Sequence, residues 1–378
     1  MLAATSPGRA FPRQKIVGQN ARPNCARWCI LSRDREPGRS SIRKYNLALI
    51  GFGNVGRELV RLLTAKEGEL RKNYGIEWNL TGVASRRIGW IADPNGLNPS
   101  AALAQRWPEA RGGKTPKDVR EWIAASRADV VFEASSLNRQ TGQPAIDHLK
   151  AALEAGAHAI SANKGPVVHA YHELCALAIK NGRKFFFEST VMDGTPVFSM
   201  FPHCLPAVEL RGFRGILNST TNVVLTEMEK GLSLEQAVKK AQEIGVAETD
   251  PSDDLDGWDA AVKVAALTIV LMGVPIKLEE IERVGIRALP PEHVRAARAA
   301  GMRYKLICRA ERTSDGRMHA SVKPEQLPMS DPFALLEGTT SALRLDMDVF
   351  GLSIIEHKPG VIATAYGLLA DFIRAAKS

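Results

Sequence analysis

Six carboxylates and one lysine lie within sixteen residues, positions 248–263, of this chain of 378 residues. Asp259 and Lys263 are four residues apart, so on a helix their side chains share one face. Such pairs are common on solvated helices, where they contribute only about 0.3–0.5 kcal/mol. Lys263, however, stands among alanines and valines that predict a buried helix over residues 260–271. We therefore favour a polar cluster at the edge of a buried helix, in which Lys263 donates a proton or binds a substrate.

A glycine-rich turn joins an apolar strand, residues 45–50, to a helical pattern at residues 57–63. The turn reads Gly51-Phe52-Gly53-Asn54-Val55-Gly56. Its first glycine allows the tight turn, the second lets the backbone approach a pyrophosphate, and the third lets the helix pack on the strand. Strand, glycines and helix in this order predict a dinucleotide-binding domain, with the phosphates at the helix N-terminus. The alternative is a glycine-rich turn that binds no ligand.

The end of the second predicted strand, residues 78–84, bears on the choice of coenzyme. An NAD-selective site usually places Asp or Glu there, to bond the ribose 2′-hydroxyl. This chain has Ser85, Arg86 and Arg87 instead. Two guanidinium groups and a hydroxyl suit a 2′-phosphate, so we favour NADP(H) over NAD(H). The alternative is a pair of surface arginines with no role in binding.

Strands and helices alternate up to residue 188, which predicts a doubly wound α/β domain. The strand at residues 128–136 ends in Ser135 and Ser136. The strand at residues 158–161 leads into a predicted loop, residues 162–166, that carries Lys164. Carboxyl ends of parallel strands meet at one sheet edge, where ligands bind. We therefore expect these three side chains to face the coenzyme.

After residue 188 the pattern changes to an α+β texture. Ser233 and Gln236 form a capping box at the start of one helix. Asp315-Gly316 predicts a hairpin turn between two strands. The expected elements are a loop at 189–196, strands at 209–217, 304–311, 318–324 and 342–350, and helices at 223–230, 232–244, 260–271, 290–300 and 361–376.

Charge and composition limit the possible functions. Of the net charge of +9, residues 1–44 carry +8, because they hold eight Arg and two Lys against two acids. The rest of the chain has no basic excess that would suggest nucleic-acid binding. No apolar run is long enough to span a membrane, so no membrane partner is expected. Five scattered cysteines fit a reducing compartment.

Residues 1–44 have no helical or strand period and are excluded from the fold prediction. They are rich in Arg, Ser, Pro and Gly, which fits an organelle transit peptide, a disordered tail or a start codon placed too far upstream. The expected location is therefore cytoplasmic, or plastid or mitochondrial if the extension is a transit peptide.

From about residue 45 onwards, the chain resembles the homoserine dehydrogenase family. The resemblance rests on stretches in the right order, of which the last two are specific to the family: residues 51–56, 161–166, 188–196, 215–222 and 248–263. It implies a Rossmann domain at 45–187, a catalytic and dimerisation α+β domain at 188–350, and a terminal segment at 351–378 that packs back on the first domain. It also implies a homodimer with no regulatory domain, so feedback by threonine is not expected.

The resemblance implies roles for individual residues. Lys263 would protonate the substrate oxygen, Asp259 would position the substrate and that lysine, and Lys164 would lie between nicotinamide and substrate. Burial would lower the pKa of Lys263 and neighbouring carboxylates would raise it again. The implied substrate-binding residues are Glu248, Asp254, Asp259 and Thr221. A site for Na⁺ or K⁺ is implied at Glu188 with backbone carbonyls near Val191, Asp193 and Thr195.

The implied reaction is the NAD(P)H-dependent reduction of L-aspartate 4-semialdehyde to L-homoserine, a step of threonine and methionine biosynthesis. The chain departs from the family pattern at Ser219, at residues 192–194, and at residues 356–360, where a glycine-rich sequence is usual. These departures leave two alternatives open. One is a related NADP-dependent dehydrogenase of another semialdehyde or hydroxy amino acid, and the other is an NADP(H)-binding sensor without turnover.

Overall fold

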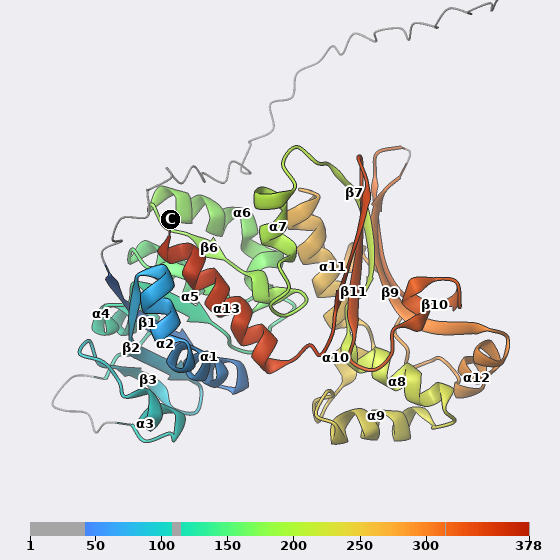
Figure 1. Cartoon of the computed structure of the whole chain (residues 1–378), viewed down its shortest axis with the longest axis horizontal. Helices are drawn as coiled ribbons and strands as arrows, with labels where there is room; N and C mark the ends of the chain where they lie inside the picture. The colour runs from blue at the N-terminus through green and yellow to red at the C-terminus, as the bar shows by residue number, and fades with distance from the viewer. Residues whose placement is uncertain (1–41, 108–114, 314, 378) are drawn as a thin grey trace, which may run out of the picture.

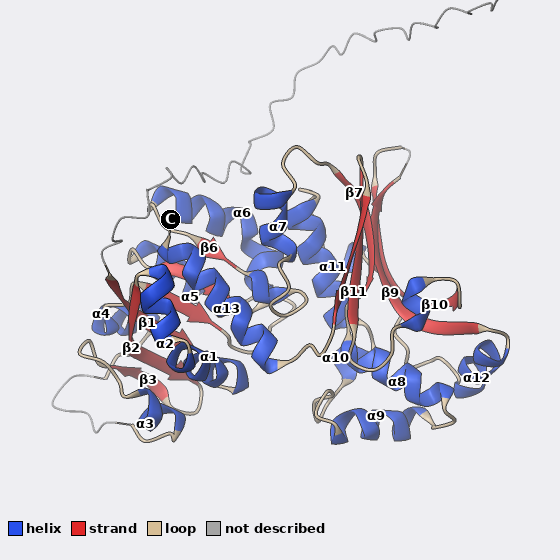
Figure 2. Ribbon diagram, viewed as in Figure 1, coloured by secondary structure: helices blue, strands red, loops and turns tan. Residues whose placement is uncertain are grey.

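The computed structural model describes residues 42–107, 115–313 and 315–377. The predicted extension, residues 1–44, therefore lies almost wholly outside the described residues. Two sheets, each with its own helices, form the two halves of the molecule (Figure 1 and Figure 2). A buried helix, α11 (Trp258–Leu271), lies between them.

The first sheet has the strand order β3-β2-β1-β4-β5-β6 in the described part of the chain. All neighbouring strands are parallel except β3, which runs antiparallel to β2. This order confirms the doubly wound α/β prediction. Its strands are β1 (Arg43–Ile50), β2 (Ile76–Ser85), β3 (Gly89–Ala92), β4 (Val130–Glu133), β5 (His158–Ser161) and β6 (Phe185–Phe186). Its helices include α1 (Asn54–Ala65), α2 (Glu67–Glu69), α3 (Pro99–Leu103), α4 (Val119–Ser126), α5 (Ala145–Glu154) and α6 (Lys164–Lys180).

The second sheet has the order β12-β11-β7-β9-β10-β8 in the described part of the chain. Its neighbouring strands are antiparallel, apart from the short parallel pair β8 and β10. The strands are β7 (Leu210–Ile216), β8 (Glu282–Arg283), β9 (Met302–Arg312), β10 (Met318–Pro328), β11 (Ser341–Met347) and β12 (Gly351–Glu356). The helices of this half include α8 (Ser219–Glu229), α9 (Leu234–Glu243), α10 (Ser252–Leu255) and α12 (Pro291–Ala299), while α7 (Val197–Cys204) packs on α11. The α+β character of this half is confirmed.

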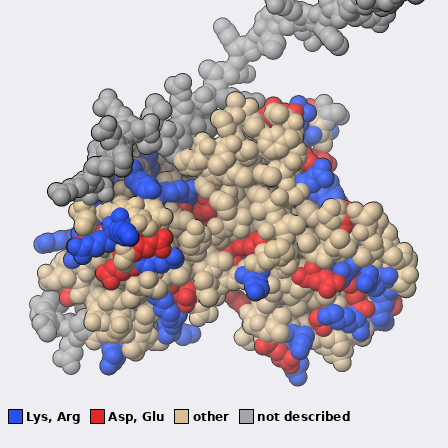
Figure 3. Space-filling model, in the orientation of Figure 1, with Lys and Arg blue, Asp and Glu red and all other residues tan. Residues whose placement is uncertain are grey.

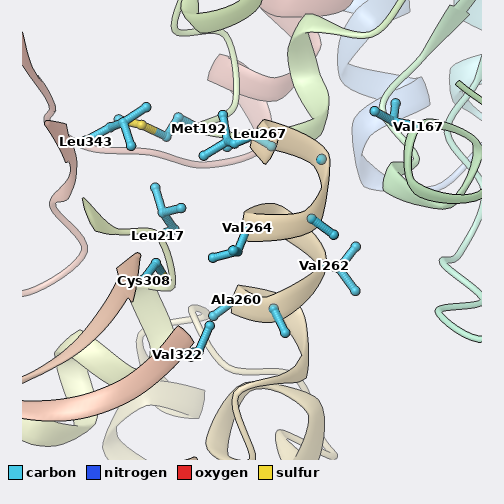
Figure 4. Close-up of a cluster of buried hydrophobic side chains, with 14 of the residues drawn as sticks. Val167, Met192, Leu217, Ala260, Val262, Val264, Leu267, Cys308, Val322 and Leu343 are labelled. Atoms are coloured by element: carbon cyan, nitrogen blue, oxygen red, sulfur yellow. The ribbon is translucent and has the colours of Figure 1, made fainter. Parts of the chain in front are cut away.

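Helix α11 joins the cores of the two halves. Ala260, Val264 and Leu267 are fully buried in one hydrophobic cluster with residues of β9, β10 and β11. Figure 4 shows these side chains opposite Cys308, Val322 and Leu343, and it also shows Val167 of α6 in the same cluster. An alanine- and valine-rich helix packs closely on both neighbours because its side chains are small. The predicted buried helix is therefore confirmed, and it fixes where Asp259 and Lys263 can lie.

The last helix, α13 (Val361–Ala376), returns to the first half and lies beside α1 (Figure 1). Leu368 and Phe372 are buried in the core of the first sheet. The Tyr45 hydroxyl donates a hydrogen bond of 3.0 Å to the carbonyl of Ala376. The prediction of a returning helix is confirmed. The boundary at residue 350 is wrong, because residues 351–356 form β12 and pair with β11 in the second sheet.

Three local predictions need correction. Residues 162–166 are not all loop, because Asn163 caps α6 through the Gly165 N–H (2.9 Å) and the helix begins at Lys164. Asn218 likewise caps α8, which begins four residues before the predicted start. Helix α7 was not predicted, since Pro196 precedes it and Pro202 lies within it. The capping box at Ser233 is confirmed.

Candidate active site

Asp259 holds two lysines from different halves of the molecule. Its Oδ2 lies 3.1 Å from Nζ of Lys263, and its Oδ1 lies 3.3 Å from Nζ of Lys164. All three side chains are 18–20% exposed, so solvent reaches them without fully solvating them. Three of the residues predicted to do chemistry are thus brought together at the junction of the two halves.

The helix ends explain this arrangement. Lys164 is the first residue of α6, directly after strand β5, whose carboxyl end faces the ligand edge of the sheet. Asp259 is in the first turn of α11, which starts after Gly257 in the left-handed conformation (φ 78°). Lys263 follows one turn later and donates a second hydrogen bond, of 2.6 Å, to the carbonyl of Leu217. The amine of Lys263 is therefore held from two sides.

Asn218 is a site residue that the sequence reasoning did not single out. Its Nδ2 donates to Oδ1 of Asp254 (2.6 Å) and to Oδ2 of Asp259 (3.0 Å). Its Oδ1 accepts from the N–H of Thr221 (2.8 Å), so the amide has only one consistent orientation. Asn218 thereby links two carboxylates that would otherwise repel each other. The sequence feature that could have identified Asn218 is its place within the family-specific stretch 215–222, directly before a helix.

The charges of the cluster follow from burial and from the ion pairs. Burial raises the pKa of Asp259, but Lys263 and Lys164 outweigh it and hold that pKa well below the ordinary value. Burial lowers the pKa of Lys263, and the Asp259 carboxylate outweighs it, so this pKa is raised. Burial, then the Asp259 charge, raises the pKa of Asp254. Lys263 therefore carries its proton at neutral pH and can act as an acid.

Two predicted substrate ligands do not join this cluster. Thr221 is fully buried, and its hydroxyl donates back to the carbonyl of Asn218 (3.1 Å), so it supports the cap of α8 and is not exposed to a substrate. Glu248 is exposed on the loop after α9, where its carbonyl accepts from Gln242. Since the structure gives its side chain no contact with Asp254 or Asp259, a substrate role for Glu248 stays a prediction.

Glu356 is a carboxylate that the family pattern does not predict. It ends β12 at the start of the segment where glycines are usual. Burial and the charge of Asp193 raise its pKa to about 7, against a hydrogen bond with Thr195 and the charge of Lys263. Its Oε2 is buried without a hydrogen-bond partner among the described residues. Glu356 thus adds a titratable group close to the lysine cluster.

The glycine turn has the geometry of a dinucleotide site. Gly51 has φ 92°, and a Cβ there would lie 2.3 Å from the carbonyl carbon of Ala134. A Cβ on Gly56 would lie 2.4 Å from the carbonyl oxygen of Gly51. A Cβ on Gly53 would meet nothing within 4 Å, which leaves that backbone open to a phosphate. Phe52 is buried and Asn54 is exposed at the start of α1, with Val55 between these extremes. Gly51 and Gly56 therefore have the turn and packing roles predicted for them, and the approach of a pyrophosphate to Gly53 stays a prediction.

The remaining predicted coenzyme residues lie at the same sheet edge. Ser135 follows β4 and bonds the Glu133 carboxylate. The carbonyls of Ser135 and Ser136 accept from Nδ2 of Asn163, which ties two strand ends together. Arg86 and Arg87 are exposed directly after β2. Since a 2′-phosphate would approach the end of β2, both arginines have access to it.

The predicted cation ligands have other partners. Glu188 is 3% exposed, and its carboxylate accepts from the N–H groups of Phe198 (2.7 Å) and Ser199 (2.9 Å) at the start of α7. The Asp193 carboxylate accepts from the Gly360 N–H (2.5 Å) and the Thr364 hydroxyl (3.0 Å) at the start of α13. In the described part of the chain, no three His, Cys, Asp or Glu residues are grouped to hold a metal. The carboxylates of Glu188 and Asp193 therefore bind protein groups, and a cation site formed at Glu188 with the backbone carbonyls near Val191, Asp193 and Thr195 stays a prediction.

Charged side chains of both signs lie on the surface outside the site. On the face shown in Figure 3, acidic and basic side chains lie interspersed over both halves. Within the described residues, no helix is long and apolar enough to cross a membrane.

Two family models cover most of the chain. Residues 51–188 match the model described as the NAD binding domain of homoserine dehydrogenase, and residues 196–373 match the model described as homoserine dehydrogenase. The chain belongs to the homoserine dehydrogenase family. It is therefore an NAD(P)-dependent oxidoreductase that acts on a small-molecule substrate.

Relatives in this family match the chain over most of its length. The NAD(+)-dependent homoserine dehydrogenase of Pseudomonas canavaninivorans is 35% identical over 343 residues, which cover 89% of this chain and 97% of that protein. The homoserine dehydrogenase of Methanocaldococcus jannaschii is 32% identical over 335 residues, which cover 87% of this chain and 97% of that protein. The crystal structure of a homoserine dehydrogenase from Thiobacillus denitrificans matches with a TM-score of 0.76 and 27% identity, over 90% of this chain and 74% of that one.

Proposed function

We propose that the protein interconverts L-aspartate 4-semialdehyde and L-homoserine, with Lys263 as the proton donor in the direction of reduction. The observation that carries this proposal is the pair of lysines on one carboxylate, Lys263 and Lys164 on Asp259, at the junction between the coenzyme half and the second half. A carbonyl oxygen that becomes an alkoxide needs a proton and a positive environment, and this cluster supplies both.

When bound, the nicotinamide coenzyme supplies the hydride that reduces the aldehyde carbon. Lys263 gives its Nζ proton to the oxygen as negative charge develops there. The raised pKa of Lys263 keeps the amine charged at neutral pH before each turnover. The Asp259 carboxylate and the Leu217 carbonyl fix the direction of that amine. Lys164 stabilises the same oxygen from the coenzyme side through its charge.

The substrate's ammonium group needs anionic partners. Asp254 lies beside Asp259, and Asn218 donates to both, so the two carboxylates form one acidic wall of the site. We propose that Asp254 binds the ammonium group and that Glu248 joins it when substrate is present. A change of Asp254 to Asn should then raise the KM for homoserine at least tenfold while changing kcat less. An unchanged KM contradicts this role.

We propose NADP(H) as the preferred coenzyme. Arg86 and Arg87 are exposed at the end of β2, and no acidic residue stands there to bond a ribose 2′-hydroxyl. The Pseudomonas relative is named NAD(+)-dependent, so the choice needs a direct measurement. Changing both arginines to Ser should raise the KM for NADP⁺ more than tenfold and leave the KM for NAD⁺ nearly unchanged. A wild-type enzyme with the higher kcat/KM on NAD⁺ refutes the preference.

We also propose that the protein is a homodimer. Strand β12 is an edge strand of the second sheet; Ile355 is exposed on it, and Val349 and Phe350 are exposed just before it. Exposed apolar side chains along a sheet edge support association with a second copy. Light scattering on the purified full chain measures the mass directly. A monomer at micromolar concentration contradicts the proposal.

Homoserine-dependent reduction of NADP⁺ at alkaline pH tests the central proposal. The full chain should turn over, and Lys263→Ala should lose about 10²–10⁴-fold in kcat. Lys240→Ala, at an exposed position on α9, is the matched control and should behave as wild type. A protein that binds NADPH but is silent on both homoserine and aspartate semialdehyde refutes the proposal. A hydroxy amino-acid panel then separates a related dehydrogenase from a sensor.

A further inference from the structure

The buried carboxylate of Glu188 already has a cationic partner. Besides the two N–H groups of α7, its Oε2 lies 3.2 Å from Nη2 of Arg374. Arg374 is in the last turn of α13, so it reaches Glu188 from the far end of the chain. The guanidinium also lies over the ring of Phe186, 4.8 Å from its centroid, in the strand that leads to Glu188. The Arg374 guanidinium of α13 thus contacts the Glu188 carboxylate, which follows strand β6 of the first sheet.

A second acid completes the arrangement. Asp371, one turn before Arg374 on the same helix, forms an ion pair with it and is fully buried. The other carboxylate oxygen of Asp371 accepts from the backbone N–H of Glu188 (2.9 Å). Arg374 and Asp371 therefore hold both the side chain and the main chain of Glu188. Both carboxylates are contacted by the same nitrogen of the guanidinium, Nη2, which therefore bridges Glu188 and Asp371.

These partners take up most of the capacity of the Glu188 carboxylate to bind a monovalent metal ion. A carboxylate offers about four lone-pair sites, and two N–H donors and the Arg374 guanidinium lie against those of Glu188. A buried carboxylate requires a counter-charge, and the guanidinium supplies it without a bound ion. The N-terminus of α7 adds further positive potential.

The neighbouring acid is engaged in the same way at the other end of α13. Asp193 caps this helix through Gly360 and Thr364. A Cβ on Gly194 would lie 2.5 Å from the carbonyl of Ala363, which shows how closely residues 188–195 pack on α13. Protein groups thus fasten the segment to both ends of one helix.

We propose that the Arg374 guanidinium is the built-in cation of this segment: it is the fixed counter-ion of Glu188, and it holds residues 188–195 against α13 without Na⁺ or K⁺. The segment matters to the site because the charge of Asp193 acts on Lys263. That consequence for turnover rests on the proposed function. The counter-ion role itself does not, since it concerns the stability of the folded chain.

Thermal unfolding of the full chain in NaCl, KCl and choline chloride at one ionic strength tests the counter-ion role. The wild type should unfold at the same temperature in all three salts. Arg374→Gln should unfold lower by on the order of 5–10 °C, because it leaves a buried carboxylate without its charge partner. Arg344→Gln, which removes an exposed arginine of β11, is the control and should change little. Arg374→Lys keeps the charge and should recover part of the loss.

Two results overturn the proposal. One is a saturable rise of the wild-type unfolding temperature with Na⁺ or K⁺, and the other is an Arg374→Gln variant as stable as Arg344→Gln. Where Arg374→Gln does not fold, the wild-type salt series and Arg374→Lys still decide. Turnover of the wild type in the same salts is the second readout. If homoserine is not a substrate, the unfolding series remains valid, so the two failures can be told apart.

Discussion

Replacing Asn218 with Asp separates its two structural roles. An aspartate keeps the oxygen that accepts from the Thr221 N–H, and Asp is as good an N-cap as Asn. The helix α8 should therefore keep its start. The change removes both Nδ2 hydrogen bonds, to Asp254 and Asp259, and places a third carboxylate beside them. The fold should survive while the acidic wall of the site is disturbed.

The size of the effect follows from the two contacts. They measure 2.6 and 3.0 Å, and each joins a neutral amide donor to a carboxylate. Such bonds contribute about 1.5–3 kcal/mol each, so the lower bound for the pair is about 3 kcal/mol. At about 1.4 kcal/mol per factor of ten, this corresponds to a loss of roughly 10²-fold in kcat/KM. An added negative charge also binds the Lys263 proton more tightly, which lowers kcat further.

Steady-state kinetics with homoserine and thermal unfolding give the two readouts. Asn218→Asp should lose about 10²-fold in kcat/KM and should fold but unfold at a lower temperature than wild type, because the two lost hydrogen bonds also stabilise the fold. Asn218→Ala loses the cap as well and should be less stable than Asn218→Asp by about 1 kcal/mol. An Asn218→Asp enzyme within threefold of wild type would show that the link between Asp254 and Asp259 does not matter for turnover. A variant that unfolds like Asn218→Ala would refute the separation of roles.

Three further changes have defined outcomes. Burial lowers the pKa of His158 to about 4, and its Nδ1 accepts from the Lys184 N–H, so the folded ring is neutral. The neutral ring contributes its full stabilisation above about pH 6.5, and this stabilisation is lost as the pH falls towards 4. His158→Gln should therefore flatten this part of the profile of unfolding temperature against pH, relative to wild type. Gly51→Ala should destabilise the fold and abolish NADPH binding in a fluorescence titration. Gly53→Ala should fold normally and bind NADPH more weakly. Equal stability of the two variants contradicts the close packing around Gly51. Lys164→Met should lower kcat about 10²-fold, because it removes the positive charge that lies beside Asp259. An unchanged kcat argues against a role of Lys164 at the reacting oxygen.

Local patterns predicted the site better than they predicted its supports. Asp259 and Lys263 are close in sequence, and a helical spacing alone brings them together. Lys164 could be assigned because strand ends of a parallel sheet share one edge. The partners of Glu188 could not be foreseen, since Arg374 lies 186 positions away and reaches it only because α13 returns to the first half.

The missed elements have physical reasons too. Helix α7 contains Pro202 and follows Pro196, so its pattern reads as a loop, and its first N–H groups are satisfied by the distant carboxylate of Glu188. Strand β12 alternates between exposed and half-buried residues at a sheet edge, which is a weak pattern. In both cases contacts with distant segments outweigh the local preference.

The position of α13 in the fold determines which half of the protein can complete its core first during synthesis. The coenzyme half begins with β1, but Leu368 and Phe372 at the end of α13 belong to its core. During synthesis from the N-terminus, the ribosome must therefore complete the whole second half before the first can close. The apolar surface of the nascent coenzyme half therefore stays uncovered while about 170 residues of the second half are synthesised. Truncation within α13 should consequently damage dinucleotide binding, although no residue of that helix belongs to the glycine turn.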